Sequence, residues 1–340
     1  MRFLYFLVIT LLWFGCNSEP APAPVSEESK TAVKPIPSLS PSPSPSPQSS
    51  PPLEPIPTVV PTVTPTPTPT PVIKIPTLET NFDGTLDELF FGYVLNEGGS
   101  VQFKVKDFLA DDDWIVKMML PAGLSKPGPG GSSQLESFSK AFHYGTYAAR
   151  FKPGSCASTQ EGVVSAFFTY YNDGKDYNGN GMVDNSEIDI EILCAEPTVV
   201  YLTLWTDYSD DENFRKTTRK INFATGEIKQ TTLGQEGQWG LNTKLKSSSL
   251  LLPGLNLFSN YRLLGFTWTA SSVRFFLNHQ GKEIELWNYK NSKNIPQHPA
   301  YMMFNVWHNA YHWHNDKPAA SPAKNVLMNV DWFQYFHNVQ

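Results

Sequence analysis

Short apolar and alternating runs recur throughout residues 77–340, and turn-forming residues separate them. The runs are 101–105, 114–120, 147–151, 163–171, 188–193, 199–205, 262–269, 273–277, 301–307 and 326–336. Residues 127–131 (Pro-Gly-Pro-Gly-Gly) and 278–281 (Asn-His-Gln-Gly) have the composition of turns. A period of two predicts β-strands, and long stretches with the 3.6-residue period of helices are absent. Many short strands of this kind predict an all-β sandwich or barrel.

The most informative run is 187–191, in which Glu187, Asp189 and Glu191 alternate with two isoleucines. On a strand, such residues point to one face, about 6.6 Å apart, because a strand rises ~3.3 Å per residue. Carboxylates this close repel, so at least one should have a raised pKa and hold a proton near neutrality. A protonated carboxyl group beside an ionised one is what glycoside hydrolysis requires. The alternative is a solvated acidic face on an amphipathic strand.

Composition narrows the classes of function. The net charge of the 340 residues is −6, and a nucleic-acid-binding protein would need a basic stripe. We therefore expect no nucleic-acid partner. Nine tryptophans are present; some must fill a core, but tryptophans in loops would suit stacking against sugar rings. Residues 77–340 are enough for one sizeable domain.

Residues 1–16 have the pattern of a signal peptide. Arg2 precedes the apolar run 3–14, which is too short to cross a bilayer as a helix but fits a signal h-region. Gly15 before a lone Cys16 resembles a bacterial lipobox, in which Cys16 is lipidated and becomes the mature N-terminus. We expect a lipoprotein anchored through this lipid to a membrane of the bacterial cell envelope, at the outer membrane or cell surface. Plain secretion is the alternative.

Residues 17–76 are predicted to be a disordered linker. They contain 19 of the 29 prolines of the chain, interleaved with serine and threonine. Such sequence buries little surface and stays extended in polyproline-like form. At about 3.1 Å per residue the segment could reach at most ~190 Å, which suits holding a domain away from a membrane.

Motifs in residues 135–340 together resemble glycoside hydrolase family 16, most closely its bacterial lichenase branch. They include Y-G-x-Y at 144–147, S-x-F-F-T-Y at 165–170, E-I-D-I-E at 187–191, F-N-V-W at 304–307 and D-W at 331–332. The resemblance implies that 77–340 is a catalytic domain with a concanavalin A-like jelly-roll fold, a sandwich of two antiparallel sheets with a concave substrate cleft. We expect a monomer that needs no cofactor for its chemistry.

The resemblance also implies endo-hydrolysis of β-glucan with retention of configuration. Glu187 matches the nucleophile, Glu191 the acid/base, and Asp189 the residue that hydrogen-bonds the nucleophile. The spacing E-x-D-x-E favours mixed-linkage β-1,3-1,4-glucan, since laminarinases and agarases usually have E-x-D-x-x-E. However, Tyr201 and Thr203 stand where lichenases usually have Gln and Asn, so a laminarin-type substrate stays open.

The same resemblance indicates residues that bind the sugar chain. Trp307 and Asn305 match a subsite tryptophan and asparagine of the family. Trp205 and Trp313 are further candidates for stacking, and Tyr201 lies at a position that contacts the sugar near the cleavage point. For each tryptophan the alternative is a place in the core.

Two regions are candidates for structural calcium. Residues 176–187 fit the loop pattern D-x-N-x-N-G-x5-E, but its last position is the proposed nucleophile. The ligands would therefore come from Asp176, Asn178, Asn180 and Asp184, unless the segment is only an Asn-Gly-rich hairpin loop. Asp331 matches a residue that helps to hold the structural calcium of the family.

Cys156 and Cys194 remain once Cys16 is set aside, and an even pair in an oxidising envelope predicts a disulfide. Two buried free thiols are the alternative.

Two other functions also stay open. One is a non-catalytic glycan-binding adhesin on the same fold, although three crowded acids argue against it. The other is a transglycosylase that remodels envelope glucan, which would use the same residues.

Overall fold

The computed structural model describes residues 77–84, 87–96, 98–124, 128–210, 212–237, 240–309 and 318–337. The predicted signal peptide, Cys16, the linker 17–76 and Trp313 lie outside the described residues, so lipidation and an envelope location stay predictions. Within the described part, no helix is long and apolar enough to cross a membrane.

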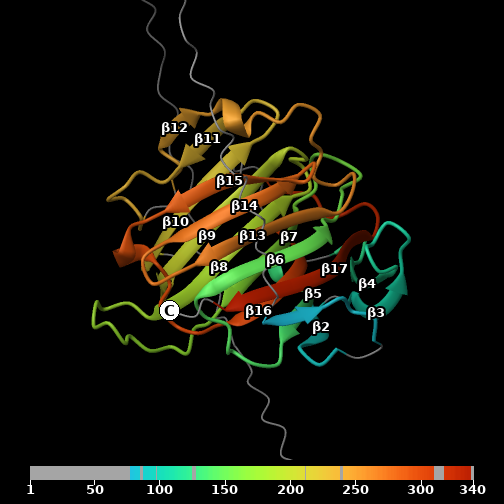
Figure 1. Cartoon of the computed structure of the whole chain (residues 1–340), viewed down its shortest axis with the longest axis horizontal. Coiled ribbons are helices and arrows are strands. Elements are labelled where there is room, and N and C mark those ends of the chain that lie inside the picture. Colours follow the sequence, from blue (N-terminus) through green and yellow to red (C-terminus); the bar gives the residue numbers. More distant parts are fainter. Residues whose placement is uncertain are drawn as a thin grey trace, which may run out of the picture. The chain divides into compact units, whose positions relative to one another are not determined.

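Nine strands form one antiparallel sheet, in the order β12-β11-β10-β9-β8-β7-β16-β5-β2 (Figure 1). Their bounds are β2 Phe90–Asn96, β5 Gly128–Ser137, β7 Val163–Tyr170, β8 Asp184–Leu193, β9 Val199–Tyr208, β10 Phe214–Asn222, β11 Glu227–Gln230, β12 Thr243–Lys246 and β16 Tyr301–His308. The strand that contains the three acidic residues, β8, lies near the middle of this sheet.

Eight strands form the second sheet, which is also antiparallel, in the order β15-β14-β13-β6-β17-β4-β3, with β1 paired to β17. Their bounds are β1 Leu78–Thr80, β3 Ser100–Lys106, β4 Trp114–Leu120, β6 Gly145–Lys152, β13 Arg262–Trp268, β14 Val273–His279, β15 Lys282–Tyr289 and β17 Val326–His337. Two short 3-10 helices, η1 Ser248–Leu250 and η2 Ser292–Asn294, lie in the connections.

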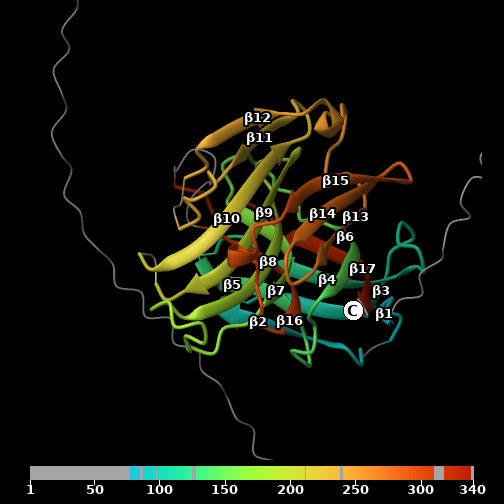
Figure 2. The same cartoon turned by 60° about the vertical axis from the view of Figure 1, so that its left-hand side comes forward.

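The two sheets pack face to face, as Figures 1 and 2 show, and an apolar core fills the space between them. Phe167 of the nine-stranded sheet contacts Phe266 of the other sheet, with ring centroids 5.8 Å apart. Ile188 and Ile190 are fully buried in the same core. Because side chains alternate along a strand, burying these isoleucines turns Glu187, Asp189 and Glu191 to the outer face. The predicted sandwich of two antiparallel sheets is confirmed.

The predicted turn at 127–131 is wrong. Residues 128–131 belong to β5, which lies between β16 and β2 and pairs with both. Glycine and proline favour turns locally, but here hydrogen bonds from two neighbouring strands determine the backbone, and the pairing with β16 is irregular between Trp307 and His308. Several strands were also not predicted, namely β1, β2, β10, β11, β12 and β15.

Candidate active site

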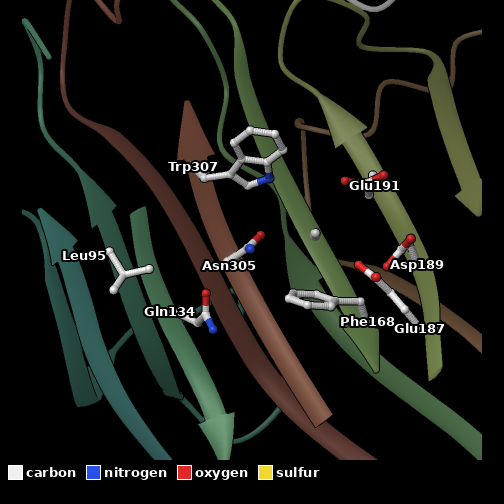
Figure 3. A pocket seen from close by; sticks show the side chains of 9 residues that line it. Leu95, Gln134, Phe168, Glu187, Asp189, Glu191, Asn305 and Trp307 are labelled. Carbon is white, nitrogen blue, oxygen red and sulfur yellow. The ribbon is translucent and has the colours of Figure 1, made fainter. Parts of the chain in front are cut away.

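The three carboxyl groups of β8 lie side by side on the outer face of the nine-stranded sheet (Figure 3). Asp189 is only 3% exposed, whereas Glu187 and Glu191 are partly exposed. The register between β8 and β9 shifts between Asp184 and Glu187, so β8 contains one extra residue there. A bulge of this kind changes the direction of the side chains that follow it, and bulges are common beside active sites.

A cleft of about 190 Å³ opens over these carboxyl groups. Asn305 and Trp307, both on β16, line it together with the triad (Figure 3). The strand pairing explains this grouping, since Asn305 lies opposite Ala166 of β7, and Ala166 lies opposite Glu191. The other lining residues are Leu95, Gln134, Ala166 and Phe168. Acidic, amide and aromatic side chains therefore converge on one cleft, which is the usual make-up of a small-molecule site.

The ionisation of the triad is uneven. Burial raises the pKa of Glu187 to about 7, although hydrogen bonds from Asn185 and Asp189 and the charge of Lys216 act in the opposite direction. Burial and the charge of Glu187 raise the pKa of Glu191 to about 8. Burial, followed by the charges of both glutamates, raises the pKa of Asp189 well above its usual value. Of the two glutamates, Glu187 therefore has the lower pKa and ionises first.

Hydrogen bonds hold two of these groups in place. The side-chain amide of Asn185 donates to Oε2 of Glu187 at 2.7 Å. Asp189 is hydrogen-bonded to Glu187 and also accepts a hydrogen bond from Trp205. Both contacts to Glu187 stabilise its ionised form. These contacts favour ionisation of Glu187 over that of Glu191, which lies four residues along the same strand.

A family model describes this part of the chain. Residues 99–229 match "Glycosyl hydrolases family 16". The resemblance to this family that the sequence motifs indicate is thereby confirmed for these residues. The match begins before the expected limit at residue 135, so β3 and β4 are part of the family domain, and it includes the whole of β8. The described domain is thus that of a glycoside hydrolase.

Solved structures similar to this chain include several glucanases. A Bacillus licheniformis beta-glucanase is 18% identical, with 77% of this chain and 98% of the other covered and a TM-score of 0.46. A lichenase from a mouse hindgut metagenome is 20% identical, with 76% and 98% covered and a TM-score of 0.46. A laminarinase from Thermotoga petrophila is 13% identical, with 78% and 98% covered and a TM-score of 0.49. No curated protein matches the chain.

Two further residues with a predicted substrate role lie beside the cleft without lining it. Tyr201 pairs with Glu191 across β8 and β9, but it is only 3% exposed and packs with Val164 and Leu193. Trp205 pairs with Glu187, and its ring contacts Tyr208 and Phe214 edge-on. Both side chains therefore pack against other residues of the protein, and a sugar-binding role for them stays a prediction.

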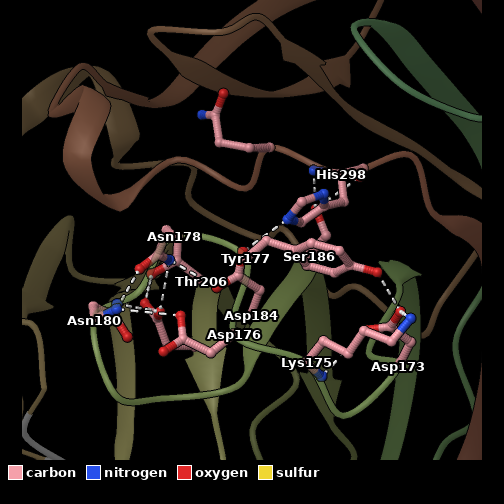
Figure 4. Close-up of polar contacts among 12 residues, drawn as sticks. Asp173, Lys175, Asp176, Tyr177, Asn178, Asn180, Asp184, Ser186, Thr206 and His298 are labelled. Carbon is pink, nitrogen blue, oxygen red and sulfur yellow. Dashed lines mark hydrogen bonds and ion pairs between the residues drawn. The ribbon is translucent and has the colours of Figure 1, made fainter.

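The predicted calcium loop lies next to the start of β8 (Figure 4). The carboxylate of Asp176 accepts backbone N–H groups of residues 179–181. The side-chain amide of Asn178 donates to Asp184 at 2.7 Å, and that of Asn180 donates to Asp207 at 2.6 Å. Asp184 also contacts Nε2 of His298 at 2.8 Å. The loop is thus held by hydrogen bonds among its own polar groups, and a calcium role for it stays a prediction.

Asp331 is fully buried at the other predicted calcium position. Its carboxylate accepts hydrogen bonds from Nη1 of Arg150 and from the backbone N–H of Asp111, the latter at 3.1 Å. The guanidinium of Arg150 therefore already balances the charge that was assigned to a cation, so these residues do not fit a calcium ion as they stand. Within the described residues no group of three or more His, Cys, Asp or Glu side chains could hold a metal.

Cys156 and Cys194 form a disulfide, with their Cα atoms 5.2 Å apart. Cys194 directly follows β8, so the disulfide joins the end of this strand to the segment that precedes β7. Glu161 of this segment is 1% exposed and accepts the backbone N–H groups of Ala157 and of Ala323, which lies just before β17. The disulfide thus fixes the end of β8 to a segment that these hydrogen bonds hold in place.

The raised pKa of Glu191 predicts a pH-dependent stability difference. Because folding favours its protonated form, the stability it contributes is complete below about pH 4.5 and is lost as the pH rises through about 8. Glu191→Gln should therefore have an unchanged Tm near pH 5 and a Tm higher than wild type by about 2–4 °C at pH 8.5, which corresponds to on the order of 1 kcal/mol. Thermal melts at the two pH values test this, and equal melting temperatures at both would contradict it.

Proposed function

We propose that this protein is an endo-acting, retaining β-glucanase. The observation that supports this most is the triad itself, three carboxyl groups in one cleft, in which hydrogen bonds from Asn185 and Asp189 favour ionisation of Glu187 and burial raises the pKa of Glu191 to about 8. The match to glycosyl hydrolases family 16 supports the reaction class. The glucanases of similar structure are named for mixed-linkage glucan and for laminarin, so β-glucan is the substrate class to test first.

In the proposed reaction, Glu191 donates its proton to the leaving glycosidic oxygen while the carboxylate of Glu187 attacks the anomeric carbon. Glu191, now ionised, then takes a proton from water, and this water releases the sugar from Glu187 with net retention. The protonated Asp189 donates its hydrogen bond to Glu187 and so stabilises it as the leaving carboxylate. Two carboxyl groups on one strand perform these roles only because their pKa values differ.

The purified protein should release new reducing ends from barley mixed-linkage glucan or from laminarin, with agarose as the control polymer. Internal cleavage should lower the viscosity of the polymer before short products accumulate. Release of reducing ends from mixed-linkage glucan alone would assign the specificity of a lichenase, and release from laminarin alone would assign that of a laminarinase. Binding without release would support the adhesin instead, and products longer than the substrate would support a transglycosylase.

Trp307 should contribute substrate affinity rather than chemistry. It lines the cleft from β16 and packs against the small cluster of Val164, Leu193, Val199 and Tyr201, so its ring is held firmly beside the triad. Trp307→Ala should raise KM about tenfold or more, a factor that corresponds to ~1.4 kcal/mol, while kcat changes less. Steady-state kinetics on the cleaved polymer test this, with Trp307→Phe as the variant expected to keep most of the affinity. An unchanged KM in the alanine variant would remove Trp307 from the substrate site.

A further inference from the structure

A lysine lies in line with the nucleophile across the outer face of the sheet. Lys216 on β10 is opposite Trp205 on β9, and Trp205 is opposite Glu187 on β8. Neighbouring strands are about 4.8 Å apart, so the Cα atoms of Lys216 and Glu187 are separated by roughly 10 Å. The ammonium of Lys216 lies 4.8 Å from the centre of the Trp205 ring. Its side chain therefore extends over the tryptophan towards the triad.

Regular strand pairing puts Lys216 on the face of the triad. Residues 216–222 of β10 pair without interruption with residues 199–205 of β9, and three of these β9 residues pair with Glu187, Asp189 and Glu191. Residues opposite each other in such a ladder point to the same face, so Lys216 lies on the side of the triad. The register shifts only beyond this point, between Arg215 and Lys216, where β9 contains one extra residue, Thr206.

We propose that Lys216 is a positioning residue of the active site, the cation that lies over Trp205 and keeps the crowded carboxyl groups of β8 in the charge state that catalysis needs. The proposal rests on the glycosidase function proposed above. An ammonium facing three acids favours their ionised forms, so it keeps Glu187 charged at a pH where burial alone would protonate it. Conversely, the charges of Glu191, Asp189 and Glu187 oppose the effect of burial, which lowers the pKa of Lys216 to about 8.

Other ionisable groups also surround the triad. Burial, followed by the charge of Glu187, raises the pKa of Tyr170 on β7 to about 12, so this residue stays neutral over the relevant range. Tyr201 on β9 donates a hydrogen bond to Glu196, and Lys220 on β10 pairs with the same carboxylate at 2.6 Å. Farther across the sheet, Glu136 on β5 accepts a hydrogen bond from Tyr93 on β2 at 2.8 Å. Lys216 is the cation whose charge acts on all three acids of β8.

The test is the pH profile of kcat/KM for Lys216→Met on the polymer that the wild type cleaves. Loss of the cation raises the pKa values of both Glu187 and Glu191, so both limbs of the bell-shaped profile should move to higher pH by about one unit. Lys216→Arg keeps the charge and should keep the wild-type profile. Lys220→Met is the matched control, because Lys220 lies 4.9 Å from the ring of Tyr201 on the same strand and face but pairs with Glu196. Its profile should not move.

A second measurement does not depend on activity. Carbon-13 NMR titration of the glutamate carboxyl groups, assigned with Glu187→Gln and Glu191→Gln, should show both groups titrating about one unit higher in Lys216→Met. This shift would support the role of Lys216 even if no polymer were hydrolysed and the proposed function failed. A Lys216→Met variant with unchanged titration curves would overturn the proposal. So would activity lowered equally at every pH, since that is the result of a merely structural role.

Discussion

Glu187→Gln should lower kcat on the polymer substrate by about a thousandfold or more, with little change in fold or glucan binding. An amide cannot attack the anomeric carbon, so the covalent intermediate of the retaining reaction does not form. The substitution keeps the shape of a side chain that Asn185 contacts at 2.7 Å, so the cleft should stay assembled. Reducing-end assays measure the turnover, and circular dichroism with a glucan-binding isotherm shows whether the protein remains folded.

Glu136→Gln is a suitable control for this variant. Glu136 is a partly exposed carboxyl group on the same sheet, and burial raises its pKa as well, but it lies on β5, three strands from β8. Its substitution should change turnover only a few fold.

Azide rescue separates the roles of Glu187 and Glu191. With an activated aryl glycoside, Glu187→Ala should give the α-glycosyl azide and Glu191→Ala the β-glycosyl azide. Wild-type turnover in Glu187→Gln would show that the assigned nucleophile is wrong.

Removal of the disulfide should cause the largest loss of stability. Cys156 and Cys194 are 38 residues apart, and a loop of that length implies a stabilisation of about 4 kcal/mol from the restricted unfolded chain. The double variant Cys156→Ser, Cys194→Ser should therefore melt on the order of 10 °C below the wild type. Differential scanning calorimetry at pH 7 measures this. Activity at 25 °C should persist, because neither cysteine lines the cleft.

Wild-type protein treated with a reductant is the matching control for the disulfide, and its melting temperature should fall to that of the double variant. The double variant itself should not respond to the reductant. A melting temperature of the wild type that is insensitive to reduction would contradict the stabilising role. Thiol titration of denatured, non-reduced protein gives a second test, because reactive thiols at both positions would exclude the bond.

The sequence was sufficient to predict the elements in which each residue's environment follows from the strand itself. In β8 the isoleucines alternate with acids, so burial of Ile188 and Ile190 determines the direction of the triad, and the structure shows this arrangement. The motif around Asn305 and Trp307 likewise indicated two residues that line the same cleft. These features depend on local alternation and on one family resemblance, and both can be read without knowledge of strand pairing.

Other parts of the site depend on strand pairing, which is not visible in a single sequence. Gln134 lines the cleft from β5, whose first residues have the composition of a turn. Lys216 faces the triad through the pairing of β10 with β9 and of β9 with β8, and Asn185 reaches Glu187 within the bulge of β8. Neither the pairing of strands nor the position of a bulge can be read from alternation alone, so the sequence gives no signal for the roles of these two residues. Asp331 shows the opposite case. The sequence motif indicates Asp331 itself but gives no sign of its ion-pair partner, Arg150.

Proton NMR of the first products tests the central claim most directly. The purified protein is mixed with barley mixed-linkage glucan or laminarin, and the anomeric signals of the new reducing ends are followed from the first minutes, before mutarotation mixes them. A retaining reaction through Glu187 and Glu191 predicts that the β-anomer appears first and that the α-anomer grows in only later. Early appearance of the α-anomer would mean inversion, and the assignment of Glu187 as a nucleophile would then be wrong.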